Sequence, residues 1–283
     1  RFMHTVRSDP VYVEGIANVV EIYMEVSRQK READRRKAAQ SQKFEQDIAN
    51  LSPRSQKKAR ADRKKQEEAD HARAATEAKQ AAAAAGKPRS ITYMRGDPDP
   101  IGEGLLSLGA QGQAHRYATL LLNSAPNFLR TQVVAGRVAV YRKRLVQACA
   151  ALRAAQAIDK SHATVFALAA SILFASASEE AGSAVAKMFE ALRTELFDGA
   201  TSADSFVERW SSAHGTDAAH AFELCKCFLR HCQNADAAKA RIRRAVVNAS
   251  TDLQLCLDVL AFLKDEEAVL GSDTLAWWKE TCV

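Results

Sequence analysis

The sequence predicts an all-α protein, built as an α-solenoid of helical pairs with one long basic helix. Glycine (12) and proline (6) are scarce for 283 residues, and alanine is abundant. Runs of β-branched and aromatic residues, which are typical of strands, are almost absent. No apolar run approaches the ~20 residues that a membrane-spanning helix needs, so we predict no membrane association.

The first segment carries an amphipathic pattern. Its apolar side chains have the i, i+3, i+4, i+7 spacing of a helix and are Ile16, Val19, Val20, Tyr23 and Met24. Because the sequence begins at Arg1, we expect a segment of a longer chain, in which residues 1–27 end an upstream helical array. Residues 28–50 are polar on every side, which fits either a solvated helix or a disordered segment.

A basic charged region is predicted for residues 28–85. Ser52 can cap a helix and Pro53 suits its first turn, and neither glycine nor a further proline follows before Gly86. This pattern predicts one helix of roughly thirty residues. Residues 28–79 contain 16 Lys/Arg and 9 Asp/Glu, whereas the whole chain has a net charge of +6, so all the excess positive charge lies here. Such a segment attracts polyanions.

The strongest basic cluster lies in the first turns of this helix and is the candidate binding site. It consists of Lys57, Lys58, Arg60, Arg63, Lys64 and Lys65. A rod with cations on most sides suits the phosphate backbone of RNA, while aromatic residues for base stacking are missing. The alternative is a solvated helix stabilised by pairs such as Lys64 with Glu68.

A linker and a helical repeat domain are predicted to follow. Gly96-Asp-Pro-Asp-Pro100 opposes helix, so residues 86–104 are the expected linker. Residues 105–283 then show short helices at 112–123, 126–140, 142–157, 161–177, 180–197, 202–213, 217–232, 235–248, 252–263 and 272–281. The connection at residues 157–162 resembles the turn between tetratricopeptide-type repeats, although the Trp and Gly of that repeat are absent, so we expect degenerate repeats.

Catalytic and metal sites are not predicted. Cys225, Cys227, His231 and Cys232 invite a zinc site, but Cys225 and Cys227 point about 160° apart on a helix, which favours structural cysteines. The other histidines have no partners at motif spacing, and no acetyl-CoA-binding signature occurs, so we expect no enzymatic activity and no cofactor. Six scattered cysteines fit a reducing, cytoplasmic compartment. Trp277 and Trp278, near the C-terminus, either cap the end of the solenoid or form a hydrophobic docking site.

Several passages, in order, resemble one family. They are residues 51–65 (LSPRSQKKARADRKK), 97–103 (DPDPIGE), 121–129 (LLNSAPNFL) and 141–148 (YRKRLVQA), with weaker echoes at 195–198 and 252–260. Together they resemble the C-terminal part of the auxiliary (scaffold) subunit of the eukaryotic N-terminal acetyltransferase A (NatA) complex. The resemblance implies that a partner subunit acetylates protein N-termini with acetyl-CoA. This chain would position that partner and dock it on the ribosome, with the basic helix on ribosomal RNA.

Two alternatives stay open at this point. One is a generic tetratricopeptide-type adaptor whose basic helix binds an acidic protein, and nuclease sensitivity of its binding would discriminate against it. The other is an enzyme with an unrecognised site, which would turn over acetyl-CoA and peptides without a partner.

Overall fold

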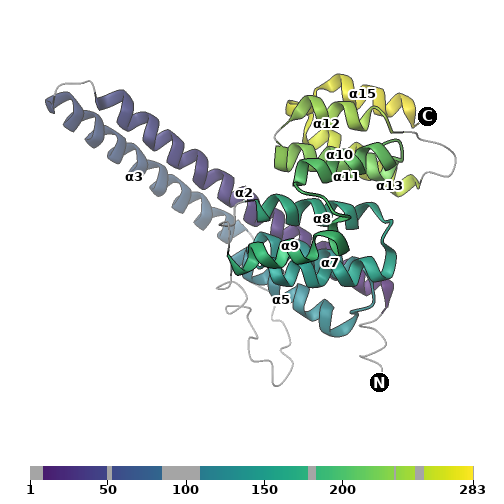
Figure 1. Cartoon of the computed structure of the whole chain (residues 1–283). Coiled ribbons are helices and arrows are strands. Elements are labelled where there is room, and N and C mark those ends of the chain that lie inside the picture. Colours follow the sequence, from purple (N-terminus) through teal and green to yellow (C-terminus); the bar gives the residue numbers. More distant parts are fainter. Residues whose placement is uncertain are drawn as a thin grey trace. The chain divides into compact units, whose positions relative to one another are not determined.

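The fold is all-α. The computed structural model describes residues 9–49, 53–84, 109–177, 183–232, 234–245 and 252–282, and no β-strand occurs in these ranges. Wherever the connection between two consecutive helices is described, it is short, as in an α-solenoid, and the predicted fold class is confirmed (Figure 1). The pairing into tetratricopeptide-type repeats stays a prediction. None of the described helices is both long enough and apolar enough to cross a bilayer.

The chain divides into two compact units. One is Tyr23–Gln113, and the other combines Arg1–Ile22 with Ala114–Val283. Helix α2 (Pro10–Ala49) contributes to both units, because it runs without interruption across the division. The helical alternative for residues 28–50 therefore holds through Ala49.

The unit Tyr23–Gln113 contains a long helical hairpin. The second part of α2 lies beside α3 (Pro53–Ala84), as Figure 1 shows in purple and slate blue. Helix α3 begins at the predicted proline, whose fixed φ suits a first helical turn. Ser52 and the predicted linker at residues 86–104 lie outside the described residues.

The larger unit consists of the first part of α2 and a series of shorter helices. Val13, Ala17 and Val20 of α2 are fully buried in it. The series is α5 (Gly109–Ser124), α6 (Leu129–Tyr141), α7 (Leu145–Asp159), α8 (Ala163–Ser176), α9 (Ala184–Phe197), α10 (Ala203–His214), α11 (Ala218–Cys227), α12 (Ala235–Ile242), α13 (Leu253–Asp265), α14 (Glu267–Leu270) and α15 (Ser272–Thr281).

Side-chain caps explain where many of these helices begin. An oxygen of the residue before the helix accepts a backbone N–H of the first turn, which otherwise has no partner. The capping residues are Ser183, Ser202, Asp217, Asn234 and Asp252. His162 does the same for α8 with its ring nitrogen, so this histidine has a structural role at the start of a helix.

Several boundaries differ from the predictions. Helix α5 begins three residues earlier than predicted, α7 three residues later and α9 four residues later, and α12 ends six residues earlier. Helix α6 begins three residues late, at Leu129, and the short helix α14 was not predicted. The helix predicted for residues 217–232 is α-helical only to Cys227, after which the chain continues as a π-helix, η1 (Phe228–Cys232). A π-helix widens each turn by one residue, and periodicity read from the sequence does not reveal that insertion.

Two hydrophobic clusters form the core of the larger unit. The first is built mainly by α6 to α10 around Trp210, and the second by α11 to α15 around Trp278. Trp278 is 1% exposed and donates its indole N–H to the carbonyl oxygen of Cys256 at 3.2 Å. Trp278 is therefore a core residue of the last helices, whereas Trp277 is only partly buried.

Candidate nucleic-acid interface

One side of α3 packs on α2, and this contact decides which cations of the basic cluster face outward. Arg63 donates to the hydroxyl of Ser41 at 2.6 Å, and its guanidinium lies 4.7 Å from the ring centre of Phe44. Gln56 donates to the carbonyl oxygen of Ala49 at 3.2 Å. Gln56 and Arg63 are seven residues apart, so they mark one face of α3 along two turns.

Arg60 lies at the border of this contact. Its guanidinium forms an ion pair of 2.6 Å with Glu45 of α2, and both side chains remain more than half exposed. The structure thus assigns two of the six predicted site residues, Arg60 and Arg63, to contacts between α2 and α3. Periodicity alone did not predict this, because α3 has no apolar face that would reveal its packed side.

The other four cations point away from α2. Lys57, Lys58, Lys64 and Lys65 are all exposed. Helical periodicity of 100° per residue places Lys57 and Lys64 on the flank, about 100° from Gln56 and Arg63, and Lys58 and Lys65 on the side opposite them. Arg54 is exposed on the same side and was not among the predicted site residues. We call these five residues the outer face of α3.

The outer face is largely free to bind a polyanion. Lys64 lies 3.9 Å from Glu68, as the alternative of a solvated helix predicts, but both side chains are about three-quarters exposed. Such an exposed pair contributes less than about 1 kcal/mol, so a phosphate group can displace Glu68. From Arg54 to Lys65 the outer face extends about 16 Å along the helix axis. This arrangement can neutralise several phosphates without reading base sequence.

Helix α2 adds further cations to the hairpin. Residues 31–40 are exposed throughout, and Arg35, Arg36 and Lys37 are among them. The charge count over residues 28–79 included these side chains, but no candidate site was assigned to them. Because α2 remains helical to Ala49, both α2 and α3 carry exposed cations in the hairpin.

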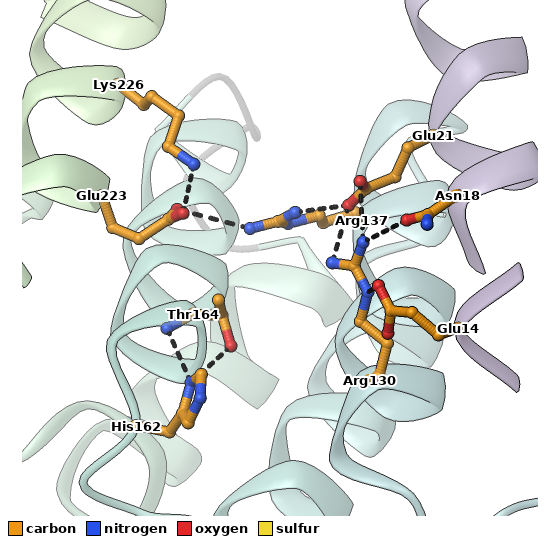
Figure 2. Close-up of polar contacts among 9 residues, drawn as sticks. All are labelled: Glu14, Asn18, Glu21, Arg130, Arg137, His162, Thr164, Glu223 and Lys226. Carbon is orange, nitrogen blue, oxygen red and sulfur yellow. Dashed lines mark hydrogen bonds and ion pairs between the residues drawn. The ribbon is translucent and has the colours of Figure 1, made fainter. Parts of the chain in front are cut away.

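A second charged cluster lies inside the larger unit and was not predicted. Figure 2 shows Glu21 of α2 between two arginines of α6: Arg130 donates to it at 2.9 Å and Arg137 at 2.8 Å. Arg130 also reaches Glu14 and Asn18 of α2. Burial alone would raise the pKa of Glu21, but the two guanidinium groups outweigh burial and lower it.

The cluster continues to α11. Arg137 also pairs with Glu223 at 3.4 Å, and Glu223 in turn pairs with Lys226. Burial of Glu223 disfavours its charge, yet Lys226 and Arg137 lower its pKa to about 2. Each carboxylate is matched by cations, so the cluster joins α2, α6 and α11 through paired charges. We interpret it as a structural network rather than a catalytic site.

The cysteine cluster does not converge. Cys225 packs in the second hydrophobic cluster and Cys227 in the first, which agrees with the prediction that the two side chains point apart. Burial raises the pKa of both thiols to about 12, so both are protonated at neutral pH. Within the described ranges, no three His, Cys, Asp or Glu side chains lie together as metal ligands would. Cys225 and Cys227 behave as small core residues.

Comparison with protein families places the first part of the chain in a known family. The model of a family described as N-terminal acetyltransferase A, auxiliary subunit, matches residues 1–155. This range includes the hairpin of α2 and α3, helices α5 and α6, and most of α7. The weaker echoes at residues 195–198 and 252–260 lie beyond it. A search of curated proteins finds no match.

Proposed function

Because this chain belongs to the auxiliary-subunit family of N-terminal acetyltransferase A, we propose that it is a non-catalytic scaffold that holds a catalytic acetyltransferase subunit at the ribosome. The family membership supports an auxiliary role and implies a catalytic partner. In this proposal acetyl-CoA and the acetyl transfer belong to that partner, the site of action is the cytoplasm, and this chain supplies rigid helical surfaces.

The outer face of α3 carries the proposed attachment to the ribosome. Five exposed cations lie on the side of the helix that α2 leaves open, and ribosomal RNA presents a continuous phosphate backbone to such a surface. The absence of Phe, Tyr and Trp from α3 fits contacts that are independent of base sequence. In this proposal Arg60 and Arg63 act indirectly and do not contact RNA, because they hold α3 on α2.

Ribosome co-sedimentation over a salt series tests the proposal. The test variant carries Ala at the four outward lysines Lys57, Lys58, Lys64 and Lys65. The matched control loses four exposed lysines of the larger unit instead: Lys160, Lys187, Lys264 and Lys279. Each phosphate contact contributes roughly one unit to the slope of log affinity against log salt, so the test variant should bind weakly with a slope lower by up to about four.

The control separates site-specific contact from net charge, because both variants lose the same four charges. Equal binding by the two variants would contradict the assignment to α3. Nuclease treatment decides against the adaptor alternative: binding that survives complete digestion of RNA would favour an acidic protein as the ligand of the basic helix.

A further inference from the structure

An open groove lies in the larger unit. Helices α5, α6 and α7 line it, and its volume is about 390 Å³. Its apolar lining consists mainly of small side chains and includes Ala118, Leu122, Ala135, Ala139 and Ala150. The volume falls within the range of typical ligand-binding pockets, and alanines allow a bound chain to approach the helices closely.

One permanently charged side chain, that of Arg142, belongs to the lining of this groove. Arg142 and His115 line it directly. Burial lowers the pKa of His115, and the nearby positive charges of Arg142 and Arg144 lower it further. The described lining contains no Asp or Glu, so no carboxylate in it balances the charge of Arg142.

The turn after α6 fixes the backbone at Arg142. Lys143 adopts a left-handed conformation with φ 59°, and its N–H donates to the carbonyl oxygen of Val140 at 2.9 Å. The N–H of Arg144 donates to the carbonyl oxygen of Ala139 at 2.8 Å. These bonds close the end of α6 and hold the backbone of the basic turn of residues 142–144 in place, with Arg142 in the lining of the groove.

Arg142 differs from the other arginines of α6. Arg130 and Arg137 are paired with carboxylates, whereas the half-buried side chain of Arg142 has no ion pair or hydrogen bond within the described residues. The C-terminus of α6 favours a positive charge at Arg142. This effect does not explain why a mostly apolar groove lies beside that charge. A half-buried guanidinium in the lining of a mostly apolar groove matches a ligand that is anionic at one point and mostly apolar elsewhere.

We propose that the groove between α5 and α7 binds a protein segment in which a carboxylate stands beside small apolar side chains. The carboxylate pairs with Arg142, and the apolar residues cover the alanines of the three helices. A protein segment fits better than RNA, because the described lining has no Phe, Tyr or Trp for base stacking and only one permanent positive charge, that of Arg142, for a phosphate backbone. This inference is independent of the proposed attachment to the ribosome.

Selection from a random twelve-residue peptide library displayed on phage tests this inference with the full 283-residue chain as the target. The charge variant is Arg142→Glu, and its control is Arg116→Glu on the exposed side of α5, which changes the net charge equally. The shape variant is Ala150→Phe, which fills the groove from an exposed helical position. Circular dichroism verifies that all three proteins are folded.

Peptides selected by the unaltered chain should be enriched in Asp or Glu next to Ala, Val or Leu. Their affinity, measured by fluorescence anisotropy, should fall about tenfold or more with Arg142→Glu and with Ala150→Phe. Arg116→Glu should leave the affinity within about threefold, since an exposed charge outside the contact has little effect.

Selected peptides without acidic enrichment, or peptides that bind the Arg142→Glu protein as well as the unaltered chain, would overturn the proposal. Labelled polyuridylic acid serves as the RNA probe in the same assay. If polyuridylic acid binds, and if Arg142→Glu weakens its binding but not the binding of the peptides, the groove binds nucleic acid rather than a protein segment.

Discussion

Arg137 donates a 2.8 Å hydrogen bond to Glu21, although the two residues are 116 positions apart in the sequence. The same guanidinium pairs with Glu223, which is almost completely buried. Glu21 lies on the helix that continues into the basic hairpin, while Glu223 lies on α11. The network therefore attaches the first part of α2 to the later helices of the larger unit.

Removal of the buried member should destabilise the protein strongly. Glu223→Gln leaves Lys226 and Arg137 buried without their full counter-charge, which should lower the free energy of unfolding by about 3 kcal/mol. The control is Glu195→Gln, which breaks an exposed pair with Arg153 and should change it by less than about 1 kcal/mol. Urea unfolding followed by circular dichroism measures both, and equal effects would refute the role of burial.

The buried pair of Trp210 and His220 should make stability depend on pH. The indole N–H of Trp210 donates to Nδ1 of His220 at 2.8 Å, so this nitrogen must be unprotonated in the folded state. Burial lowers the pKa of His220, and His214, stacked on it at 4.6 Å, lowers it further, whereas Asp217 opposes the shift. A lowered pKa means that the unfolded chain binds the proton more readily.

The stabilisation from neutral His220 is therefore complete above the ordinary histidine pKa of about 6.5, and it decreases as the pH falls below that value. Unfolding free energies measured from pH 7.5 to 5 should fall, and His220→Gln should flatten this dependence because its amide accepts the indole N–H without titrating. If the unfolding free energy of the Gln variant falls as steeply with decreasing pH, a group other than His220 is responsible for the pH dependence.

Local signals in the sequence predicted the helices. The packed side of α3 and the Glu21 network depend instead on contacts between residues that lie far apart in the sequence. Pro53 at the start of α3 and the caps of the later helices are local, so the element order was predictable. The side of α3 that packs on α2 was not predictable, because no apolar stripe marks it. Its contacts come from polar side chains: Gln56 donates to the backbone of α2, and Arg63 lies over the ring of Phe44 of α2. The Glu21 network was not predictable either, since charges 86 to 116 positions apart carry no spacing pattern.

Close packing of α6 on α8 gives a further prediction. A Cβ atom at Gly136 would lie 2.6 Å from a methyl group of Leu168, which is fully buried, so Gly136→Ala should destabilise the protein by about 1–3 kcal/mol. Gly15 of α2 has nothing within 4 Å of such an atom. Gly15→Ala should therefore stabilise by about 0.5–1 kcal/mol through helix propensity, and thermal unfolding of the two variants should shift in opposite directions.

The two sides of α3 should respond differently to loss of a positive charge. Arg63→Ala removes the contacts with Ser41 and Phe44, so amide hydrogen exchange in residues 41–48 should accelerate, corresponding to about 1 kcal/mol of lost local stability. Lys65→Ala removes the same charge from the outer face and should leave this exchange unchanged.

Ribosome co-sedimentation of the same two proteins completes the comparison. Lys65→Ala should weaken binding and reduce its salt dependence by about one unit, because one phosphate contact is lost. Arg63→Ala should keep the salt slope, since its guanidinium contacts α2 rather than the ribosome. A lower slope for Arg63→Ala with an unchanged slope for Lys65→Ala would reverse the assignment of the two sides of α3, whatever the exchange measurement shows.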